Sequence, residues 1–208
     1  MANYHGPVCR FCRREGAKLY LKGERCYTPK CAIERRAVPP GIHGMARRRK
    51  TSDYGLQLRA KQKARRTYGL LEKQFRNYFE AANHAPGVTG INLLRHLELR
   101  LDNVVYRLGM GSSRKQSRQL VSHRHFEVNG KLVNVPSYQC KPGDVVKVRG
   151  TGEKGVIEVA LEASRVRTVP TWLSFNEDEK SGKLLALPER QEMESGVEEH
   201  LIVEFYSR

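Results

Sequence analysis

Residues 100–135, RLDNVVYRLGMGSSRKQSRQLVSHRHFEVNGKLVNV, change from helical to strand periodicity within a short distance. Ser113 followed by Gln116 is typical of a capping box, and it predicts a short helix that runs through Val121. Two apolar runs then flank Asn129-Gly130, a dipeptide that is the strongest short-range signal for a β-hairpin. The stretch therefore predicts a basic helix followed by an antiparallel hairpin.

The sequence that follows continues the sheet and adds a helix. Pro142-Gly143 is a second turn, and residues 145–148 then have strand-like sequence. Residues from about 95 to 150 are thus expected to form a compact unit of helices and a small sheet. Beyond this unit the patterns predict a helix over residues 156–167 and strands over residues 171–175, 183–187 and 200–206.

Three helices are expected to begin before this unit. Ser52 is a suitable N-cap for the first helix, which ends near Tyr68-Gly69. Apolar residues at helical spacing over residues 71–82 give the second helix one stripe for core packing. The third helix begins at Thr89 and keeps the helical period of its leucines and valines without a break to Gly109.

The chain has a formal charge of +16, which comes from 38 Lys and Arg against 22 Asp and Glu. Residues 1–70 hold 18 basic and 4 acidic side chains, whereas residues 160–208 have 6 and 10. This excess predicts a polyanionic partner, because Lys and Arg neutralise phosphates and release counterions. No apolar run approaches the roughly 20 residues that span a bilayer, and the first residues lack the apolar core of a signal peptide. We expect a cytoplasmic protein with reduced thiols, no membrane partner and no small-molecule substrate.

Four of the five cysteines lie in two close pairs, Cys9-x2-Cys12 and Cys26-x4-Cys31. Such pairs suit one tetrahedral zinc ion, since each turn supplies two thiolates. Four ligands leave no open position for water, so we expect a structural site that substitutes for a core. His5 or His43 could replace a thiolate, and disulfides or a redox Cys-x2-Cys are the alternatives. Cys140 stands alone and is expected to be a small buried hydrophobe.

Basic side chains gather near the cysteines, around the first helix and around the hairpin. Arg114, Lys115 and Arg118 lie at i, i+1 and i+4, which predicts a basic ridge beside the hairpin. The arginines near the cysteines either stabilise a zinc–thiolate site of net charge about −2 or bind phosphate. The candidate RNA-binding residues, which contact phosphate or 2′-hydroxyl groups, are Arg10, Arg13, Arg14, Arg35, Arg36, Arg47, Arg48, Arg49, Lys50, Lys61, Arg65, Arg66, Arg114, Lys115, Arg118, His123, Arg124, His125, Asn129 and Lys131.

Several strings of the chain resemble a known family. Residues 100–109, 113–121 and 128–130 are similar to the RNA-binding module named after small-subunit ribosomal protein S4. The wider chain resembles the bacterial-type S4 family in its zinc-bearing version, with similar strings in order at residues 6–10, 40–44, 52–55, 74–78 and 200–207. Arg124 departs from the pattern, since many such modules have glycine there to end the helix. A left-handed backbone at a non-glycine residue costs about 1 kcal/mol.

The resemblance implies a structural ribosomal protein and not an enzyme. It implies a primary binder of 16S rRNA, which nucleates assembly of the body of the small subunit. It further implies support of translational accuracy through contacts with neighbouring ribosomal proteins, especially protein five. Messenger RNA where it enters the subunit is a further implied partner, touched by Arg47, Arg48, Arg49 and Lys50.

We therefore expect an α+β fold with four successive parts. Residues 1–45 form a zinc-binding knuckle segment, and residues 46–97 form a helical domain. Residues 98–160 form the small α+β RNA-binding module, in which helices pack on an antiparallel sheet. Residues 161–208 contribute strands and a helix that complete the two domains.

Two other kinds of protein carry the same module. In an RNA-modifying enzyme, Arg100-Leu101-Asp102 would correspond to the catalytic aspartate motif of pseudouridine synthases. However, no Thr-Ser-Gly follows it, and no second domain remains to hold a nucleoside. A stand-alone stress or ribosome-recycling factor would bind RNA through the module, but it would not explain the cysteine segment.

Overall fold

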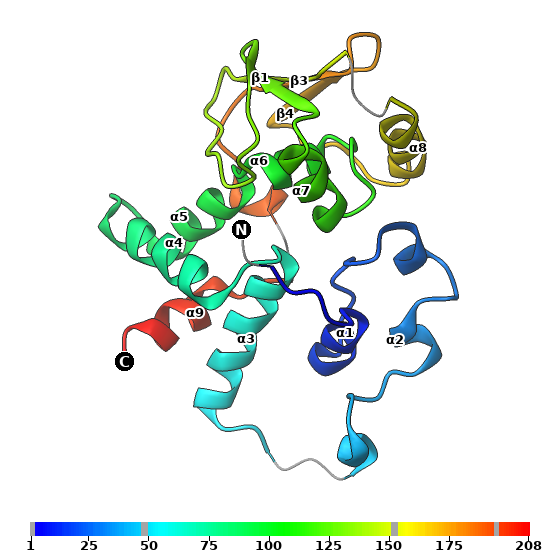
Figure 1. Ribbon diagram of the computed structural model, residues 1–208. Helices are drawn as coiled ribbons and strands as arrows, with labels where there is room; N and C mark the ends of the chain where they lie inside the picture. The colour runs from blue at the N-terminus through cyan, green and yellow to red at the C-terminus, as the bar shows by residue number, and fades with distance from the viewer. Residues whose placement is uncertain (1–2, 47–49, 151–153, 194–195) are drawn as a thin grey trace. The chain divides into compact units, whose positions relative to one another are not determined.

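The computed structural model of the chain describes residues 3–46, 50–150, 154–193 and 196–208 (Figure 1). It divides into two compact units, which we call unit 1 (Met1–Leu93 with Glu194–Arg208) and unit 2 (Leu94–Met193). The segments expected over residues 1–45 and 46–97 fall in unit 1, apart from the last residues of the second. The expected module over 98–160 falls in unit 2, and the C-terminal segment is divided between the two units.

The N-terminal part of unit 1 consists of short helical turns joined by loops. They are α1 (Cys9–Glu15), η1 (Gly23–Tyr27), α2 (Ala32–Arg35) and η2 (Ile42–Met45). Helix α1 ends where Gly16 has a φ of 68°, a left-handed conformation that glycine adopts without strain. Among residues 3–46 the buried apolar side chains are those of Leu19, Cys12, Cys26, Cys31 and Pro39. As expected, this segment has almost no hydrophobic core of its own.

The rest of unit 1 is helical. Its elements are α3 (Asp53–Thr67), α4 (Glu72–His84), the first residues of α5 (Thr89–Glu98), and α9 (Glu199–Tyr206). The Ser52 hydroxyl accepts a hydrogen bond from the Gly55 amide, which confirms the predicted N-cap of α3. Phe75, Phe79 and Ala82 of α4 are buried, which confirms the predicted apolar stripe.

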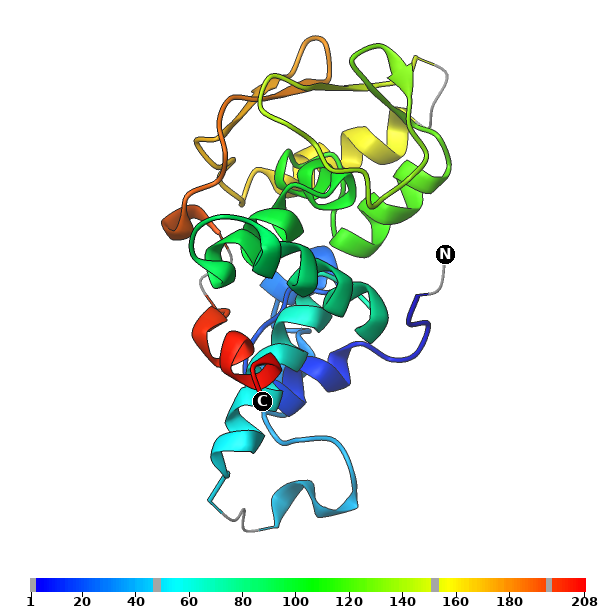
Figure 2. The same cartoon turned by 90° about the vertical axis from the view of Figure 1, so that its left-hand side faces the viewer.

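The strand predicted over residues 200–206 is wrong, because these residues form helix α9. Its apolar side chains recur at helical as well as alternating positions, and contact with α3 decides between the two periods. Ile202 is fully buried, and the Tyr206 ring stacks on Phe79 with centroids 4.5 Å apart. Figure 2 shows α9 in red against α3 in cyan, within unit 1. The C-terminal residues thus complete unit 1 as a helix.

The single helix predicted from Thr89 to Gly109 is also wrong, because the structure has two helices there, α5 and α6 (Leu101–Arg107). Arg100 between them is extended, with φ −67° and ψ 136°. It forms an isolated β-bridge with Gln139, and the Leu101 amide donates to the Tyr138 carbonyl at 2.9 Å. The break lets the chain that follows the hairpin hydrogen-bond to the start of α6.

Unit 2 contains a five-stranded antiparallel sheet in the order β2-β1-β3-β5-β4. Its strands are β1 (Phe126–Val128), β2 (Lys131–Leu132), β3 (Val145–Val148), β4 (Leu173–Asn176) and β5 (Ser181–Leu184). Asn129 and Gly130 have φ of 50° and 73°, the values of a type I′ turn. The predicted hairpin is therefore confirmed, although its second strand ends at Leu132.

The helices of unit 2 lie on one side of this sheet in both ribbon views (Figures 1 and 2). They are α6, α7 (Arg114–Ser122) and α8 (Lys154–Ser164), and the short turn η3 (Arg190–Glu192) precedes the return to unit 1. The core between them includes Leu101, Val105, Phe126 and Val146, all without exposed area, and nearly buried Cys140. Burial raises the pKa of Cys140 to about 12, which agrees with its predicted role as a small hydrophobe. Among the described residues, no helix is long and apolar enough to cross a membrane.

Replacing Ile202 by alanine should lower the free energy of unfolding of unit 1 by about 2–5 kcal/mol, because a fully buried side chain is truncated. Urea unfolding measures the loss, and amide exchange should locate it in α3 and α9. His200→Ala, at an exposed position of the same helix, is the matched control and should cost less than about 0.5 kcal/mol. Equal losses for the two variants would contradict the view that the buried Ile202 side chain packs α9 into unit 1.

Candidate nucleic-acid interface and cysteine pocket

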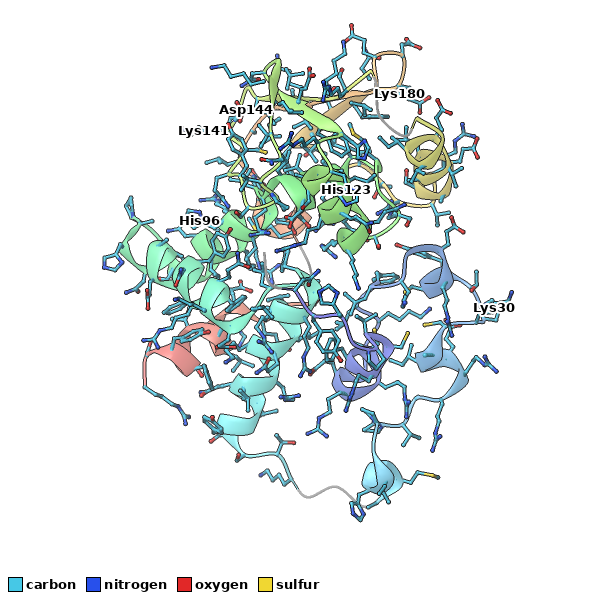
Figure 3. The ribbon with its side chains drawn as sticks, viewed as in Figure 1. Lys30, His96, His123, Lys141, Asp144 and Lys180 are labelled. Atoms are coloured by element: carbon cyan, nitrogen blue, oxygen red, sulfur yellow. The ribbon has the colours of Figure 1, made fainter. Side chains whose placement is uncertain are left out.

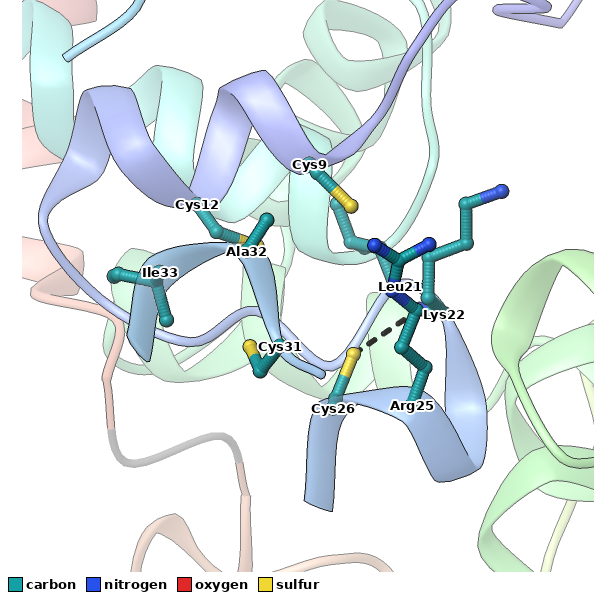
Figure 4. Close-up of a pocket in the computed structure, with 9 residues that line it drawn as sticks. All are labelled: Cys9, Cys12, Leu21, Lys22, Arg25, Cys26, Cys31, Ala32 and Ile33. Atoms are coloured by element: carbon teal, nitrogen blue, oxygen red, sulfur yellow. Dashed lines mark hydrogen bonds between the residues drawn. The ribbon is translucent and has the colours of Figure 1, made fainter. Parts of the chain in front are cut away.

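The four paired cysteines line one pocket of unit 1 (Figure 4). Two come from α1, one from η1, and one lies just before α2. The Lys22 amide donates a hydrogen bond to Cys26 Sγ at 3.4 Å. His5 and His43 are exposed and do not line the pocket. The structure thus brings the four predicted thiols together without either histidine.

The cysteines of this pocket form no disulfide bond with a described residue, and three of the four are buried. Burial raises the pKa of Cys12, and the nearby thiols of Cys26, Cys9 and Cys31 raise it further against one backbone hydrogen bond. Within the described residues, however, no group of three or more His, Cys, Asp or Glu side chains is arranged so that it could hold a metal ion. The zinc site therefore stays a prediction.

Some of the predicted RNA-binding arginines of unit 1 have partners inside it. Arg66 forms an ion pair with Glu15 at 2.5 Å, and its guanidinium lies 4.5 Å from the centroid of the Phe11 ring. Arg13 donates from Nε to the Val38 carbonyl at 2.7 Å. These two side chains hold the N-terminal segment together, and neither contact is the predicted one to phosphate.

Lys61 is likewise internal, with only 5% of its surface exposed. Its ammonium lies 2.6 Å from the Glu72 carboxylate, and Arg65 lies 3.6 Å from the same group. Burial raises the pKa of Glu72, but hydrogen bonds from Lys61 and Tyr206 outweigh this, so that the pKa lies below its ordinary value. Lys61 therefore stabilises unit 1 in place of the predicted phosphate contact.

The remaining candidates of unit 1 are open to solvent or undescribed. Exposed cations that have no ion pair within the described residues are Arg10, Arg14, Arg35, Arg36 and Lys50. Arg47, Arg48 and Arg49 lie outside the described residues. The phosphate-facing role predicted for all of these side chains stays a prediction.

Helix α7 does not carry the continuous exposed ridge that its sequence predicted. The Ser113 hydroxyl accepts from the Gln116 amide at 3.3 Å, as expected for a capping box, but the Gln116 side chain accepts from Ser112. Arg114 and Arg118 are only 9% and 8% exposed, whereas Lys115 is exposed. Both guanidiniums are buried because Asn103 and Asp102 of α6 supply polar partners for them.

One network of buried polar groups joins α5, α6 and α7. Arg107 forms two hydrogen bonds with Glu98, at 2.6 and 3.0 Å. Asn103 donates to Glu98 at 2.6 Å and accepts from Arg114 Nε at 2.8 Å. Because Glu98 has no exposed area, its charge requires these partners, and the network fixes the three helices within the unit.

A second network surrounds Asp102, the residue that the enzyme alternative would make catalytic. Both its oxygens accept from the guanidinium of fully buried Arg100, at 2.6 and 3.0 Å. Arg118 lies 3.6 Å from the same carboxylate. Asp102 is only 5% exposed, so it serves as an internal counter-ion.

Exposed basic side chains remain where α7 ends and the hairpin turns. His123, Arg124 and Lys131 are exposed, and His125 is half-buried. Arg124 has a φ of 64°. This residue therefore adopts the left-handed conformation for which many modules of this type have glycine. With Lys115, these side chains form what we call the hairpin surface. Arg124, Lys131 and Lys115 have no ion pair within the described part of the chain.

Asn129, a predicted RNA contact, forms hydrogen bonds within the protein instead. Its side chain donates to Asp144 at 2.8 Å and accepts from the Val145 amide at 2.9 Å. The other Asp144 oxygen accepts from the Lys141 amide at 2.8 Å, and Figure 3 labels Lys141 and Asp144 at the same corner of unit 2. We call these contacts the Asn129–Asp144 lock. They hold the hairpin turn against the turn that precedes β3.

Comparison with known proteins places the two parts of the chain in one family. Residues 3–98 match the ribosomal protein S4/S9 N-terminal domain, and residues 99–146 match the S4 domain. "Small ribosomal subunit protein uS4" of Pelotomaculum thermopropionicum is 60% identical, and that of Desulforamulus reducens is also 60% identical, each over the full length of both chains. The protein of that name from Halothermothrix orenii is 57% identical over the full length of both.

The chain belongs to the ribosomal protein uS4 family. The resemblance predicted from the sequence is thereby confirmed at the level of the family, and so is the expectation of mixed helices and antiparallel sheet with an S4 domain. The family is one of structural proteins, which also confirms that the chain is not an enzyme. None of these uS4 comparisons bears on zinc.

Replacing Asp144 by alanine should loosen the Asn129–Asp144 lock. Two hydrogen bonds are lost at about 1 kcal/mol each, so amide exchange of Lys141 and Val145 should accelerate roughly 5–30-fold. Asp178→Ala, an exposed acid in the β4–β5 turn, is the matched control and should leave these amides unchanged. Unchanged exchange of these amides in Asp144→Ala would show that the Asn129–Asp144 lock does not hold the hairpin turn in place.

Proposed function

We propose that this chain is a structural protein of the small ribosomal subunit that acts in the cytoplasm by binding ribosomal RNA. The full-length uS4 relatives and the S4 domain support this role. The single observation that carries RNA binding is the hairpin surface, where Lys115, Arg124 and Lys131 are exposed and without ion pairs in the described part of the chain.

The geometry of the hairpin surface suits a folded RNA backbone. Its cations come from a short capped helix and a tight hairpin, so hydrogen-bonded backbone fixes their positions. Phosphate contacts of this kind fix the position of the protein without reading the base sequence. Recognition of folded RNA depends largely on such shape and on 2′-hydroxyl contacts. A rigid scaffold with exposed cations is therefore what this function requires.

The finer parts of the role are also proposals. The chain is a primary binder of 16S rRNA, which nucleates assembly of the subunit body. It supports translational accuracy through contacts with neighbouring ribosomal proteins, in particular protein five. Lys50 and the three arginines that precede it contact messenger RNA at the point where the messenger enters the subunit. The exposure of Lys50 supports the contact by this lysine.

We further propose that the cysteine pocket binds one structural zinc ion. The donor set supports this, because four soft thiols line one pocket in a segment that has almost no apolar core. Cys9, Cys12, Cys26 and Cys31 would hold the ion once their thiols, which are not placed for coordination in this structure, close around it. Zinc would supply the folding free energy that the missing core cannot. Exposed Arg10, Arg14, Arg35 and Arg36 would then be held in place on the zinc-bound segment.

Binding of 16S rRNA as a function of salt concentration tests the RNA proposal. Arg124→Gln with Lys131→Gln should reduce the slope of log K against log salt by about 0.7–0.9 for each lost phosphate contact. Lys73→Gln with Arg165→Gln, two exposed cations outside the hairpin surface, is the control of equal charge and should change the slope less. If the wild-type chain bound 16S rRNA no better than heparin at physiological ionic strength, the proposed function would be wrong.

Zinc counted per chain tests the metal proposal. The wild type and Cys140→Ala, which alters a cysteine of the unit 2 core, should each contain one zinc. Cys26→Ser with Cys31→Ser should contain none, and amide exchange over residues 9–35 should rise sharply while unit 2 stays protected. Retention of zinc by the double variant, or its absence from the wild type grown with ample zinc, would contradict the proposal.

A further inference from the structure

The side of the sheet that faces away from the helices carries cations outside the hairpin surface. Lys147 on β3 and Lys183 on β5 are exposed, and so is Arg149, which follows β3. None of the three has an ion pair among the residues that the structure describes. We call this side the outer sheet face.

The alternation of the strands fixes this orientation. Val146 on β3 and Leu184 on β5 are fully buried against the core, so their neighbours Lys147 and Lys183 point to the opposite side. Gly182 adds to the packing of the inner side, because a Cβ there would lie 2.3 Å from a methyl carbon of Leu108. In both ribbon views the described helices of unit 2 leave the outer side uncovered (Figures 1 and 2).

The strand register places the cations of the outer sheet face near one another. Val145 pairs with Lys183, and Lys147 pairs with Ser181, so the two lysines are diagonal neighbours. Diagonal neighbours on one face lie roughly 7–8 Å apart. The Arg149 amide donates to the His125 carbonyl at 2.9 Å. This bond brings Arg149 next to the start of β1, where the hairpin surface begins.

The charge balance of the outer sheet face favours a polyanion. Along the three central strands its acid is Glu127, which lies opposite Lys147, against the two lysines and Arg149. Most of its other side chains, such as Ser174, are short and polar. A stable protein interface usually has an apolar core. The exposed apolar side chains on the named strands of this face are Val145 and Leu132, at 36% and 44% exposure, and Glu127 on β1 lies between their strands. Phosphate groups match the face better than a protein surface does.

We propose that the outer sheet face is a further contact with the RNA backbone. It is continuous with the hairpin surface, so that ribosomal RNA binds to both surfaces. The inference rests on the proposed function, since it takes ribosomal RNA as the partner. It goes beyond that function by adding Lys147, Arg149 and Lys183, which lie on neither the basic helix nor the hairpin turn. Side chains of this face would contact phosphates and leave the bases unread.

The test compares full-length variants in 16S rRNA binding over a range of salt concentrations. Lys147→Gln with Lys183→Gln should lower the slope of log K against log salt by about 0.7–0.9 per residue. The conservative pair Lys147→Arg with Lys183→Arg should keep the wild-type slope, because charge is retained. The control of equal charge is Lys73→Gln with Arg165→Gln, which should keep most of the slope.

Three outcomes would overturn the inference. The glutamine pair could match the control pair in slope and affinity. It could bind free rRNA normally and yet fail to enter assembled subunits, which would make the face a protein contact. The arginine pair could lose as much as the glutamine pair, which would point to packing and not charge. In each case wild-type binding to 16S rRNA persists, whereas failure of the proposed function would abolish that preference itself.

Discussion

A buried positive charge must have a partner, because an uncompensated one costs several kcal/mol. This constraint sets two groups of cations apart. Lys61, Arg100, Arg114 and Arg118 are buried, and each has a carboxylate or amide partner within its own unit. A second group, which includes Lys115 and Lys131, is exposed and lacks ion pairs within the described residues. The first group builds the scaffold, and the second is left for a polyanion.

The buried group determines where the exposed group lies. Arg100 interrupts the helical chain and binds Asp102, and Asp102 and Asn103 then hold Arg118 and Arg114 of α7. The end of α7 leads directly into the hairpin. Internal ion pairs therefore set the position of the cations around the turn, although those pairs never touch a ligand. In the cysteine segment, which has few buried apolar groups, we propose that a metal ion takes the place of such a scaffold.

Local signals predicted much of this fold, and contacts distant in sequence account for what they missed. Ser52, Ser113 and Asn129-Gly130 marked two helix starts and the hairpin correctly, because caps and turns depend on neighbouring residues. The break at Arg100 depends on a bridge to Gln139, and the helical state of residues 199–206 depends on contact with α3. The prediction that Arg114 and Arg118 are exposed was wrong for the same reason, because their partners Asn103 and Asp102 lie on another helix. Charged residues inside an apolar-periodic run, such as Glu98 and Asp102, were the available signal for the buried networks.

Lysine acetylation rates, measured by mass spectrometry on the unmodified sequence with and without 16S rRNA, test the division of the cations most directly. Lys61 should resist acetylation in both states, because it is buried beside Glu72. Lys115 and Lys131 should react rapidly in the free chain and slowly in the complex. The account would be contradicted if Lys61 reacted as fast as Lys115 and gained protection from RNA, or if neither exposed lysine were protected.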